Sequence, residues 1–253
     1  MSQGIPQTQT LPDDNQRKPW ECQDNDELIL KLRSYRDARH VADHPFTRAI
    51  ANGEVSREGV VSYIGQFCVF VERGGKAWLP WLLGNVPVAL EFRQAKNVLL
   101  DNLYGEFHKP ADHVDLLLDM AAKEFGADKT ALYNSTLLPE TTAFMRVEEY
   151  YAHDRSWVEG MVALGFGLET QSPRYFTEIR NGLVERYGLK DSYYYDMHIE
   201  ADVEHGDSIE VLMRAYAKPD SMESIWKAAT ESIDAYQLWH DGLYRAYVSG
   251  KRP

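Results

Sequence analysis

The chain has 253 residues, a mass of 29.0 kDa and a formal net charge of −12. A chain of this length buries about three quarters of the surface of its unfolded state, so it needs neither a disulfide nor a metal merely to fold. The acidic excess argues against a protein that coats nucleic acid. Cys22 and Cys68 are the only cysteines, which excludes a disulfide framework and a cysteine-rich zinc site. The unusual feature is eight histidines in an acidic chain.

The N-terminal segment has no sign of a targeting sequence. From Met1 to about Cys22 it is rich in Gln, Thr, Pro, Asp and Asn, without the basic start and apolar core of a signal peptide. We interpret residues 1–24 as a disordered tail that touches the domain through Trp20, and residues 25–253 as a single helical domain. The longest apolar stretch, 77–83, is broken by Pro80 and is too short to span a bilayer. We therefore expect a cytoplasmic protein that is not bound to a membrane.

Helical periodicity dominates the remaining chain, and it predicts an all-α bundle of seven or eight helices. The first helix is expected over 27–42, ahead of the interruption at His44-Pro45. Ser56 suggests the N-terminal cap of the next helix, which is apolar on nearly all sides and therefore central. Gly74-Gly75 should loosen that helix, and its second apolar piece should end near 84–87. Further helices are predicted over 90–103, 111–125, 139–165, 172–187, 191–216 and 221–249.

Three residues near position 200 have the spacing of a metal site. His198, Asp202 and His205 stand at i, i+4 and i+7. At about 100° per residue these positions point within about 60° of one another, so they share one face of a helix. Two imidazoles and a carboxylate on one face are suited to hold a metal ion.

A second pair and a lone carboxylate extend this pattern. Glu106 and His113 are also seven residues apart and lie nearly in line if their segment stays helical, although Pro110 interrupts it. Glu169 follows the apolar stretch 163–168 and could bridge two ions. Two adjacent ions, about 3.5–4 Å apart in two-metal sites, fit these spacings better than a single one. The donor types suit iron or manganese, and zinc stays open.

At this point the motifs resemble those of the haem-oxygenase-like di-metal oxidases. The resemblance rests on His44-Pro-Phe46, Glu106-x6-His113, Glu169-Thr-Gln-x-Pro173-Arg174 and the His198 to His205 segment, and it covers about residues 27–245. It is closest to the 4-aminobenzoate synthase branch, beside the pyrroloquinoline-quinone synthases and the TenA thiaminases. The resemblance implies a bundle of about seven helices, often dimeric. It also implies a full set of six metal ligands: Glu106, His113, Glu169, His198, Asp202 and His205.

Three positions depart from the branch that the chain resembles most. The 4-aminobenzoate synthases use a tyrosine where this chain has Thr47, another where it has Leu168, and a functional lysine where it has Ile179. A chain that converts its own tyrosine should keep that tyrosine. The resemblance therefore implies an oxidase that acts on a free substrate.

The function expected from this resemblance is oxidation of a small organic molecule by O2 at two Fe(II) ions, with manganese as an alternative. An amino acid or related carboxylate is the expected substrate, with desaturation, C–C cleavage, N-oxygenation or nitrile formation as outcomes and an external electron donor as an additional partner. The candidate substrate contacts are Phe67, Phe70, Trp78, Trp81, Arg174 and Tyr195. Tyr193, Tyr194 and Tyr195 are candidates for hydrogen bonds to the metal ligands.

Two other functions stay open at this stage. One is a cofactor-free oxidase resembling pyrroloquinoline-quinone synthase, which would keep full activity without metal. The other is a non-catalytic helical interaction protein, which would carry an exposed apolar patch rather than a cluster of interior polar groups. The six matched ligands favour the metal enzyme, because an apolar pocket has no use for three carboxylates unless something compensates their charge.

Overall fold

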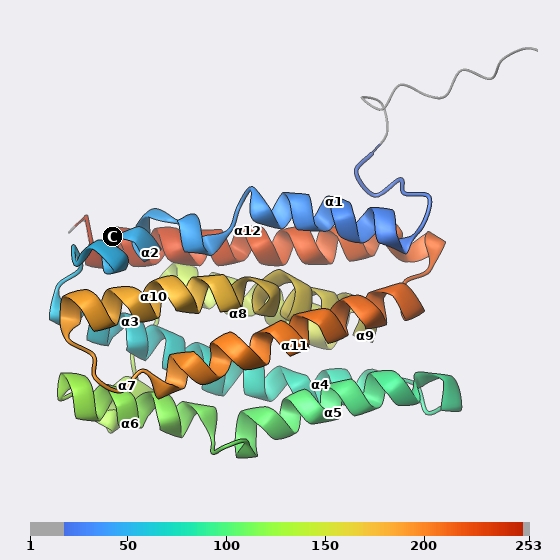
Figure 1. The fold of residues 1–253 in the computed structure, drawn as a ribbon. Coiled ribbons are helices and arrows are strands. Elements are labelled where there is room, and N and C mark those ends of the chain that lie inside the picture. Colours follow the sequence, from blue (N-terminus) through green and yellow to red (C-terminus); the bar gives the residue numbers. More distant parts are fainter. Residues whose placement is uncertain (1–17, 250–253) are drawn as a thin grey trace, which may run out of the picture.

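The computed structural model describes residues 18–249, and within that range the chain forms helices and no strand. The all-α fold class is therefore confirmed (Figure 1). The first half consists of α1 (Asn25–Asp37), α2 (Pro45–Asn52), α3 (Arg57–Phe70), α4 (Lys76–Asn85), α5 (Arg93–His108), α6 (His113–Phe125) and α7 (Lys129–Tyr133). The second half consists of α8 (Pro139–Asp154), α9 (Trp157–Met161), α10 (Ser172–Tyr187), α11 (Tyr193–Tyr216) and α12 (Met222–Tyr247).

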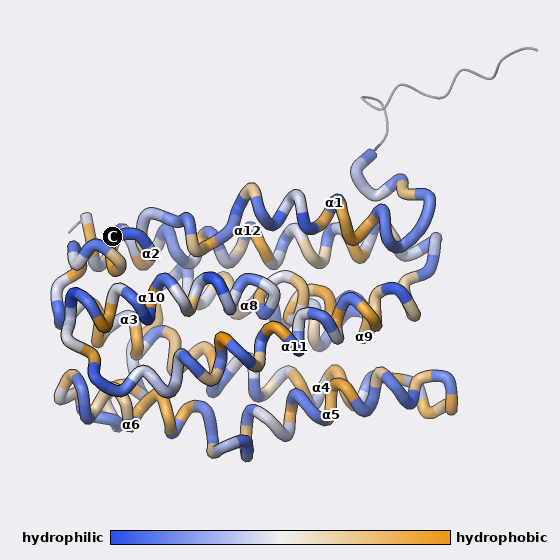
Figure 2. Tube along the Cα trace, viewed as in Figure 1, coloured by the Kyte–Doolittle hydropathy of each residue, from blue (hydrophilic) through white to orange (hydrophobic). Residues whose placement is uncertain are grey.

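The long helices lie side by side along one direction. In Figure 1, α1 and α12 form one edge of the bundle, α10 and α11 cross its middle, and α5 and α6 form the opposite edge. Helix α12 packs on α1 and α8, and α10 packs on α2 and α11. Hydrophobic and hydrophilic residues alternate along most of these helices (Figure 2), as expected when one face of each helix packs inward.

Several predicted helix ends hold and others are wrong. Ser56 caps α3 by accepting a hydrogen bond from the Gly59 N–H, as predicted. The first helix ends at Asp37 rather than Ala42, and Pro45 starts α2 instead of only interrupting a helix, because a proline fits the first helical turn. The single helix predicted over 139–165 is also wrong. It breaks at 155–156, where Ser156 and Glu159 form a reciprocal capping box that starts α9.

Two π-helical segments interrupt the central helices. Near Gly74-Gly75 the α-helix is interrupted, as expected, and the segment Val71–Gly75 forms a π-helix that joins α3 to α4. A longer π-helix, Val162–Leu168, follows α9 and leads through a 3-10 turn at Glu169–Gln171 into α10. A side chain at Gly165 would come within 2.5 Å of Ile209, so glycine is what lets this segment pack against α11. Such π segments are frequent at functional sites.

The core is rich in aromatic side chains. Trp239 on α12 stacks on Phe67 and Phe144, and Phe70 packs against both Phe144 and Trp239. This cluster joins α3, α8 and α12 at the centre of the bundle. The predicted tail falls mostly outside the described residues, and Trp20, which lies within them, packs against the core as proposed.

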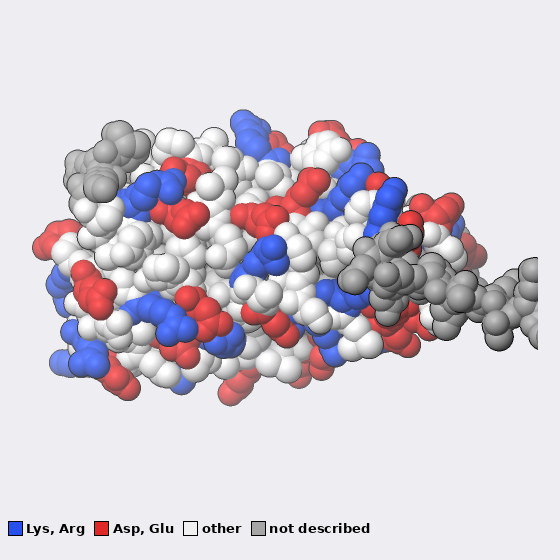
Figure 3. All heavy atoms as spheres, turned by 90° about the horizontal axis from the view of Figure 1, so that it is seen from above, with Lys and Arg blue, Asp and Glu red and all other residues white. Residues whose placement is uncertain are grey.

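The surface carries many charges of both signs. On the face shown in Figure 3, acidic and basic side chains are interspersed among uncharged ones. No helix among the described residues is long and apolar enough to cross a membrane.

Candidate metal centre

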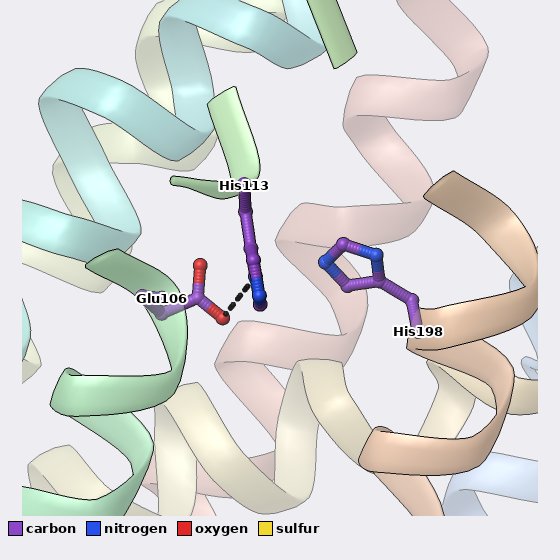
Figure 4. A group of neighbouring side chains, drawn as sticks. All are labelled: Glu106, His113 and His198. Carbon is purple, nitrogen blue, oxygen red and sulfur yellow. Dashed lines mark ion pairs between the residues drawn. The ribbon is translucent and has the colours of Figure 1, made fainter. Parts of the chain in front are cut away.

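Glu106, His113 and His198 come together at the end of α5, the start of α6 and the first turns of α11 (Figure 4). Each offers one potential ligand atom, and these atoms lie within 4.8 Å of one another. Glu106 Oε1 is 3.2 Å from His113 Nδ1, and the rings of His113 and His198 are 4.6 Å apart. We call these three residues the first ligand group.

The geometric reason given for pairing Glu106 with His113 is wrong, although the pair exists. The two residues are not in line on one helix, because α5 ends at His108 and a new helix begins at His113. The new start is set by Asp112, whose carboxylate accepts hydrogen bonds from the Val114 and Asp115 N–H groups. The turn between the helices brings His113 back toward Glu106.

Backbone carbonyls hold the two imidazoles of the first ligand group. His198 Nδ1 lies 2.8 Å from the carbonyl oxygen of Tyr194, and His113 Nε2 lies 3.0 Å from that of Lys109. One ring nitrogen of each histidine is thereby used, and the other is left for a metal: Nε2 of His198 and Nδ1 of His113. A carbonyl partner of this kind is typical of metal-binding histidines, because it fixes the ring and its tautomer.

Glu169, Asp202 and His205 form a second ligand group. His205 Nδ1 lies 3.5 Å from Asp202 Oδ1 and 3.7 Å from Glu169 Oε2. Glu169 comes from the 3-10 turn after the longer π-helix, and the other two lie on α11. Asp202 and His205 share one face of α11, as predicted. That face meets the carboxylate of Glu169.

The ionisable groups of the two sets influence one another. Burial by itself raises the pKa of Glu106, but the neighbouring His113, His198 and His205 outweigh it and hold that pKa below its usual value. Burial raises the pKa of Glu169 to about 7, with Asp202 and Glu106 adding to the effect. The two groups therefore lie close enough to affect each other's protonation.

Both histidines that face carboxylates hold their protons more tightly than a free histidine. Burial by itself lowers the pKa of His205, but Asp202 and Glu169 outweigh it and raise this pKa to about 9. For His113, burial also acts downward, and contact with Glu106 raises the pKa above its usual value. The protons on these rings take the place that a cation would take.

One cavity of about 100 Å³ contacts both ligand groups. Glu106 and His198 of the first group and Glu169 and Asp202 of the second line it. The rest of its wall is mainly apolar and includes residues from both π-helices: Phe67, Phe70, Val71, Gly75, Leu79, Leu164, Leu168, Ser172, Phe176, Tyr194 and Tyr236. The carboxylates are therefore exposed to a small, largely apolar space.

The donor set fits a pair of divalent metal ions. His113 Nδ1 and Glu169 Oε2 are buried and form no well-aligned hydrogen bond, and their contacts are the ion pairs with Glu106 and His205. A bound cation would satisfy such buried polar atoms fully. Three carboxylates offset three of the four positive charges on two divalent ions, and three imidazoles add neutral ligands. Carboxylate and imidazole ligands together suit iron or manganese.

The predicted substrate contacts divide into two sets. Phe67 and Phe70 line the cavity, whereas Trp78, Trp81, Arg174 and Tyr195 are not among its lining residues. Arg174 forms an exposed ion pair with Asp43, 2.7 Å away, and the half-exposed Trp81 packs on His153. Trp78 and Tyr195 are buried in the core. Spacing from a motif cannot show which way such side chains point.

The sequence motifs did not identify other residues of the cavity wall. Tyr236 lines the cavity from α12, far along the chain from the motifs, and Phe176 lines it from α10, two residues after the motif that ends at Arg174. Of the three candidate tyrosines, Tyr194 lines the cavity and its carbonyl holds His198, while Tyr193 is half exposed. The only available signal was the apolar periodicity of those helices, which marks every core position alike.

Glu148 is another carboxylate that could bridge two ions if Glu169 faced away from the centre. Glu169 faces the cavity, and Glu148 is fully buried elsewhere, on α8, with both carboxylate oxygens without a hydrogen-bond partner. Burial raises its pKa to about 8. The three departing positions are also buried, and the Thr47 hydroxyl donates to the Val41 carbonyl while Leu168 lines the cavity.

The helical arrangement is that of the haem-oxygenase-like fold. A TenA homologue from Pseudomonas syringae pv. tomato superposes with a TM-score of 0.74 at 14% identity, over 88% of this chain and 96% of that one. A CADD-like protein of unknown function from Nostoc punctiforme gives 0.74 at 16% identity, over 88% and 98%. A Shewanella denitrificans domain described as having a heme oxygenase-like fold gives 0.71 at 13% identity, over 88% and 93%. At these identities the likeness shows the fold alone.

The sequence comparisons identify the family. The model of the iron-containing redox enzymes matches residues 62–237, more than half of the chain, and the chain belongs to that family. The 4-aminobenzoate synthase of Nitrosomonas europaea is 26% identical over 233 residues, which is 87% of this chain and 92% of that protein. The 4-aminobenzoate synthase of Chlamydia muridarum is 25% identical over 202 residues, or 76% and 80%. The resemblance stated from the motifs is therefore confirmed.

Proposed function

We propose that the protein is a non-haem di-iron oxidase that uses O2 to oxidise a small organic substrate. Membership of the iron-containing redox enzymes supports an iron-dependent oxidoreductase. The observation that carries the finer proposal is the presence of two ligand groups, Glu106–His113–His198 and Glu169–Asp202–His205, around one cavity. Six donors on one octahedral ion would leave no position for O2, whereas the same donors shared by two ions leave open positions on each. Two manganese ions, or one of each metal, would use the same ligands.

The residues of the centre have distinct tasks in this proposal. The first ligand group would hold one ion and the second the other. When bound, two Fe(II) ions would supply two electrons and open coordination positions for O2. The protein would bind the substrate and exclude water with its apolar wall, and Glu169 and His205 would give up their protons when the second ion binds. Turnover beyond the first cycle needs an external electron donor.

The cavity favours an uncharged group at the point of reaction. Among the described residues, its lining includes no lysine or arginine, and Arg174, expected to bind a substrate carboxylate, is paired with Asp43 at the surface. An amino acid or related carboxylate therefore fits only if an apolar segment of it enters the cavity. The cavity of about 100 Å³ is smaller than the roughly 150 Å³ space that accommodates benzene in a protein core, so a few heavy atoms fill it.

The 4-aminobenzoate synthase activity of the relatives is not what we propose here. The tyrosines and the lysine expected for conversion of the chain's own residues are replaced by Thr47, Leu168 and Ile179. A free substrate is consistent with the cavity next to the ligands. Desaturation, C–C cleavage, N-oxygenation and nitrile formation are the candidate outcomes. A homodimer is the expected assembly.

The direct test is anaerobic reconstitution of the metal-free protein with Fe(II), followed by mixing with O2 and a panel of small substrates. Two irons per chain and a substrate-dependent optical transient are expected. Fewer than one iron per chain, or no transient with either iron or manganese, would contradict the proposal.

The same experiment separates the two alternative functions. Full activity in the metal-free protein would establish the cofactor-free oxidase. Absence of metal binding together with a stable metal-free fold would favour a helical interaction protein. Neither alternative explains why three carboxylates and three imidazoles gather in two groups beside one small cavity.

A further inference from the structure

Lys76 is a buried cation beside the first ligand group. Its side chain is only 4% exposed, and its ammonium lies 2.5 Å from Asp112 Oδ2 and 3.2 Å from Glu72 Oε2. The same ammonium sits 4.2 Å from the centre of the Phe107 ring. A buried lysine is rare unless it is paired, and here it is paired twice. Nothing in the sequence motifs pointed to it.

Asp112 uses its two carboxylate oxygens for different purposes. Oδ1 accepts hydrogen bonds from the backbone N–H groups of Val114 and Asp115, which starts α6 at His113. Oδ2 faces Lys76. The lysine therefore holds the capping residue that precedes a ligand, and through it the position where the ligand-bearing helix begins.

Lys76 also connects this helix start to the cavity wall and to the end of α5. Glu72 belongs to the π-helix Val71–Gly75, whose first and last residues line the cavity. Phe107 follows Glu106 directly in α5. One ammonium thus contacts three segments that meet at the break between α5 and α6. Without that break, Glu106 and His113 would lie two turns apart on one continuous helix.

We propose that Lys76, acting through Asp112, is a positioning residue that sets His113 against Glu106 for metal binding. It does so without contacting the metal or the substrate. The effect of Lys76 on metal binding rests on the proposed function. Its effect on the position of His113 can be measured in the metal-free chain. A purely stabilising role is the competing explanation, and buried ion pairs often contribute little net stability.

Two substitutions test this role. Lys76→Met keeps most of the side-chain volume and removes the charge. Asp112→Asn keeps an oxygen that can cap α6 and removes the ion pair, so it decides the matter if the methionine variant fails to fold. The control is Lys123→Met, which breaks the exposed Lys123–Asp191 pair near the other end of the same helix.

The first readout needs no metal. Nitrogen-15 NMR of the histidine rings in the metal-free protein, with His113 assigned through a His113→Gln variant, should show its signals shifted in Lys76→Met and in Asp112→Asn. They should be unchanged in Lys123→Met. The second readout is Co(II) titration followed by visible absorption. We expect an affinity loss of about 10- to 100-fold for one of the two ions, as for residues that orient metal ligands.

The outcomes separate the two proposals. Folded Lys76→Met or Asp112→Asn protein with wild-type His113 signals and wild-type Co(II) affinity would overturn the role of Lys76. If the wild-type chain binds no metal, the proposed function fails, and the His113 signals alone decide whether Lys76 positions the ring. Effects of equal size in Lys123→Met would show general destabilisation and would also overturn the inference.

Discussion

The two ligand groups of the centre are built in different ways. In the first, backbone carbonyls of Lys109 and Tyr194 hold the rings of His113 and His198. In the second, His205 Nδ1 lies 3.5 Å from Asp202 and 3.7 Å from Glu169, and its side chain is 20% exposed. The first group is therefore oriented by the fold, and the second is held together by charge. Because orientation is already established in the first group, we expect it to bind its ion first and more tightly.

The largest expected effect is on the first group. Glu106→Ala removes its only carboxylate and leaves His113 Nδ1 facing an empty space. We expect the affinity for one ion to fall by more than about 100-fold, since even residues that merely orient ligands contribute about 10- to 100-fold. Anaerobic Fe(II) titration measures it. Glu149→Ala, at a half-exposed carboxylate on α8, is the control, and equal losses in both variants would contradict the assignment.

His205→Ala should have a smaller effect, confined to the second group. Water can replace a partly exposed imidazole more easily than a buried one, so we expect a loss of about tenfold in affinity for one ion. Circular dichroism should show unchanged helicity. His153→Ala removes an exposed histidine and serves as the control. Unchanged metal occupancy in the His205 variant would remove this residue from the ligand set.

The pH dependence of metal binding should sharpen the contrast. His205 has a pKa of about 9 in the metal-free protein, and a metal needs the neutral ring, so the ion must displace a proton at pH 7. We expect the affinity of the second group to rise by about tenfold per pH unit and to level off near pH 9. Calorimetry in buffers of different ionisation enthalpy counts the released protons. An affinity that stays flat between pH 7 and 9 would contradict this account.

The raised pKa of His205 has the opposite effect on the stability of the metal-free protein, which should fall as the pH rises. The pKa of His205 lies above the roughly 6.5 of an unfolded histidine. Its contribution to stability is therefore fully present below pH 6.5 and is lost as the pH rises through 9. Urea unfolding of metal-free protein at pH 6.5 and pH 9 should show the decrease. It should be smaller in His205→Ala, where only the raised pKa of His113 still contributes.

The smallest effect is expected at Arg174. Its ion pair with Asp43 is exposed and lies outside the cavity lining, and such pairs contribute about 0–1 kcal/mol. Arg174→Ala should therefore leave iron stoichiometry unchanged and alter substrate KM by less than about threefold. A KM raised about 100-fold would restore the role in substrate binding predicted from the motif.

Local patterns explain what the sequence could and could not reveal about this molecule. Helical spacing predicted the shared face of Asp202 and His205, because a helix fixes which residues are neighbours. It failed between Glu106 and His113, where Asp112 starts a new helix and the pair forms across a turn. Tyr236 and Lys76 depend on packing between distant helices, which no local pattern encodes. The glycines of the segment before Glu169 were its only sequence sign that a π-helix forms there.

The central claim is that both ligand groups together bind a pair of ions, and anomalous diffraction at the iron edge tests it most directly. Crystals grown anaerobically with Fe(II) should show two peaks about 3.5–4 Å apart, in contact with Glu106, His113 and His198 on one side and Glu169, Asp202 and His205 on the other. A single peak, or peaks that contact neither group, would contradict the account.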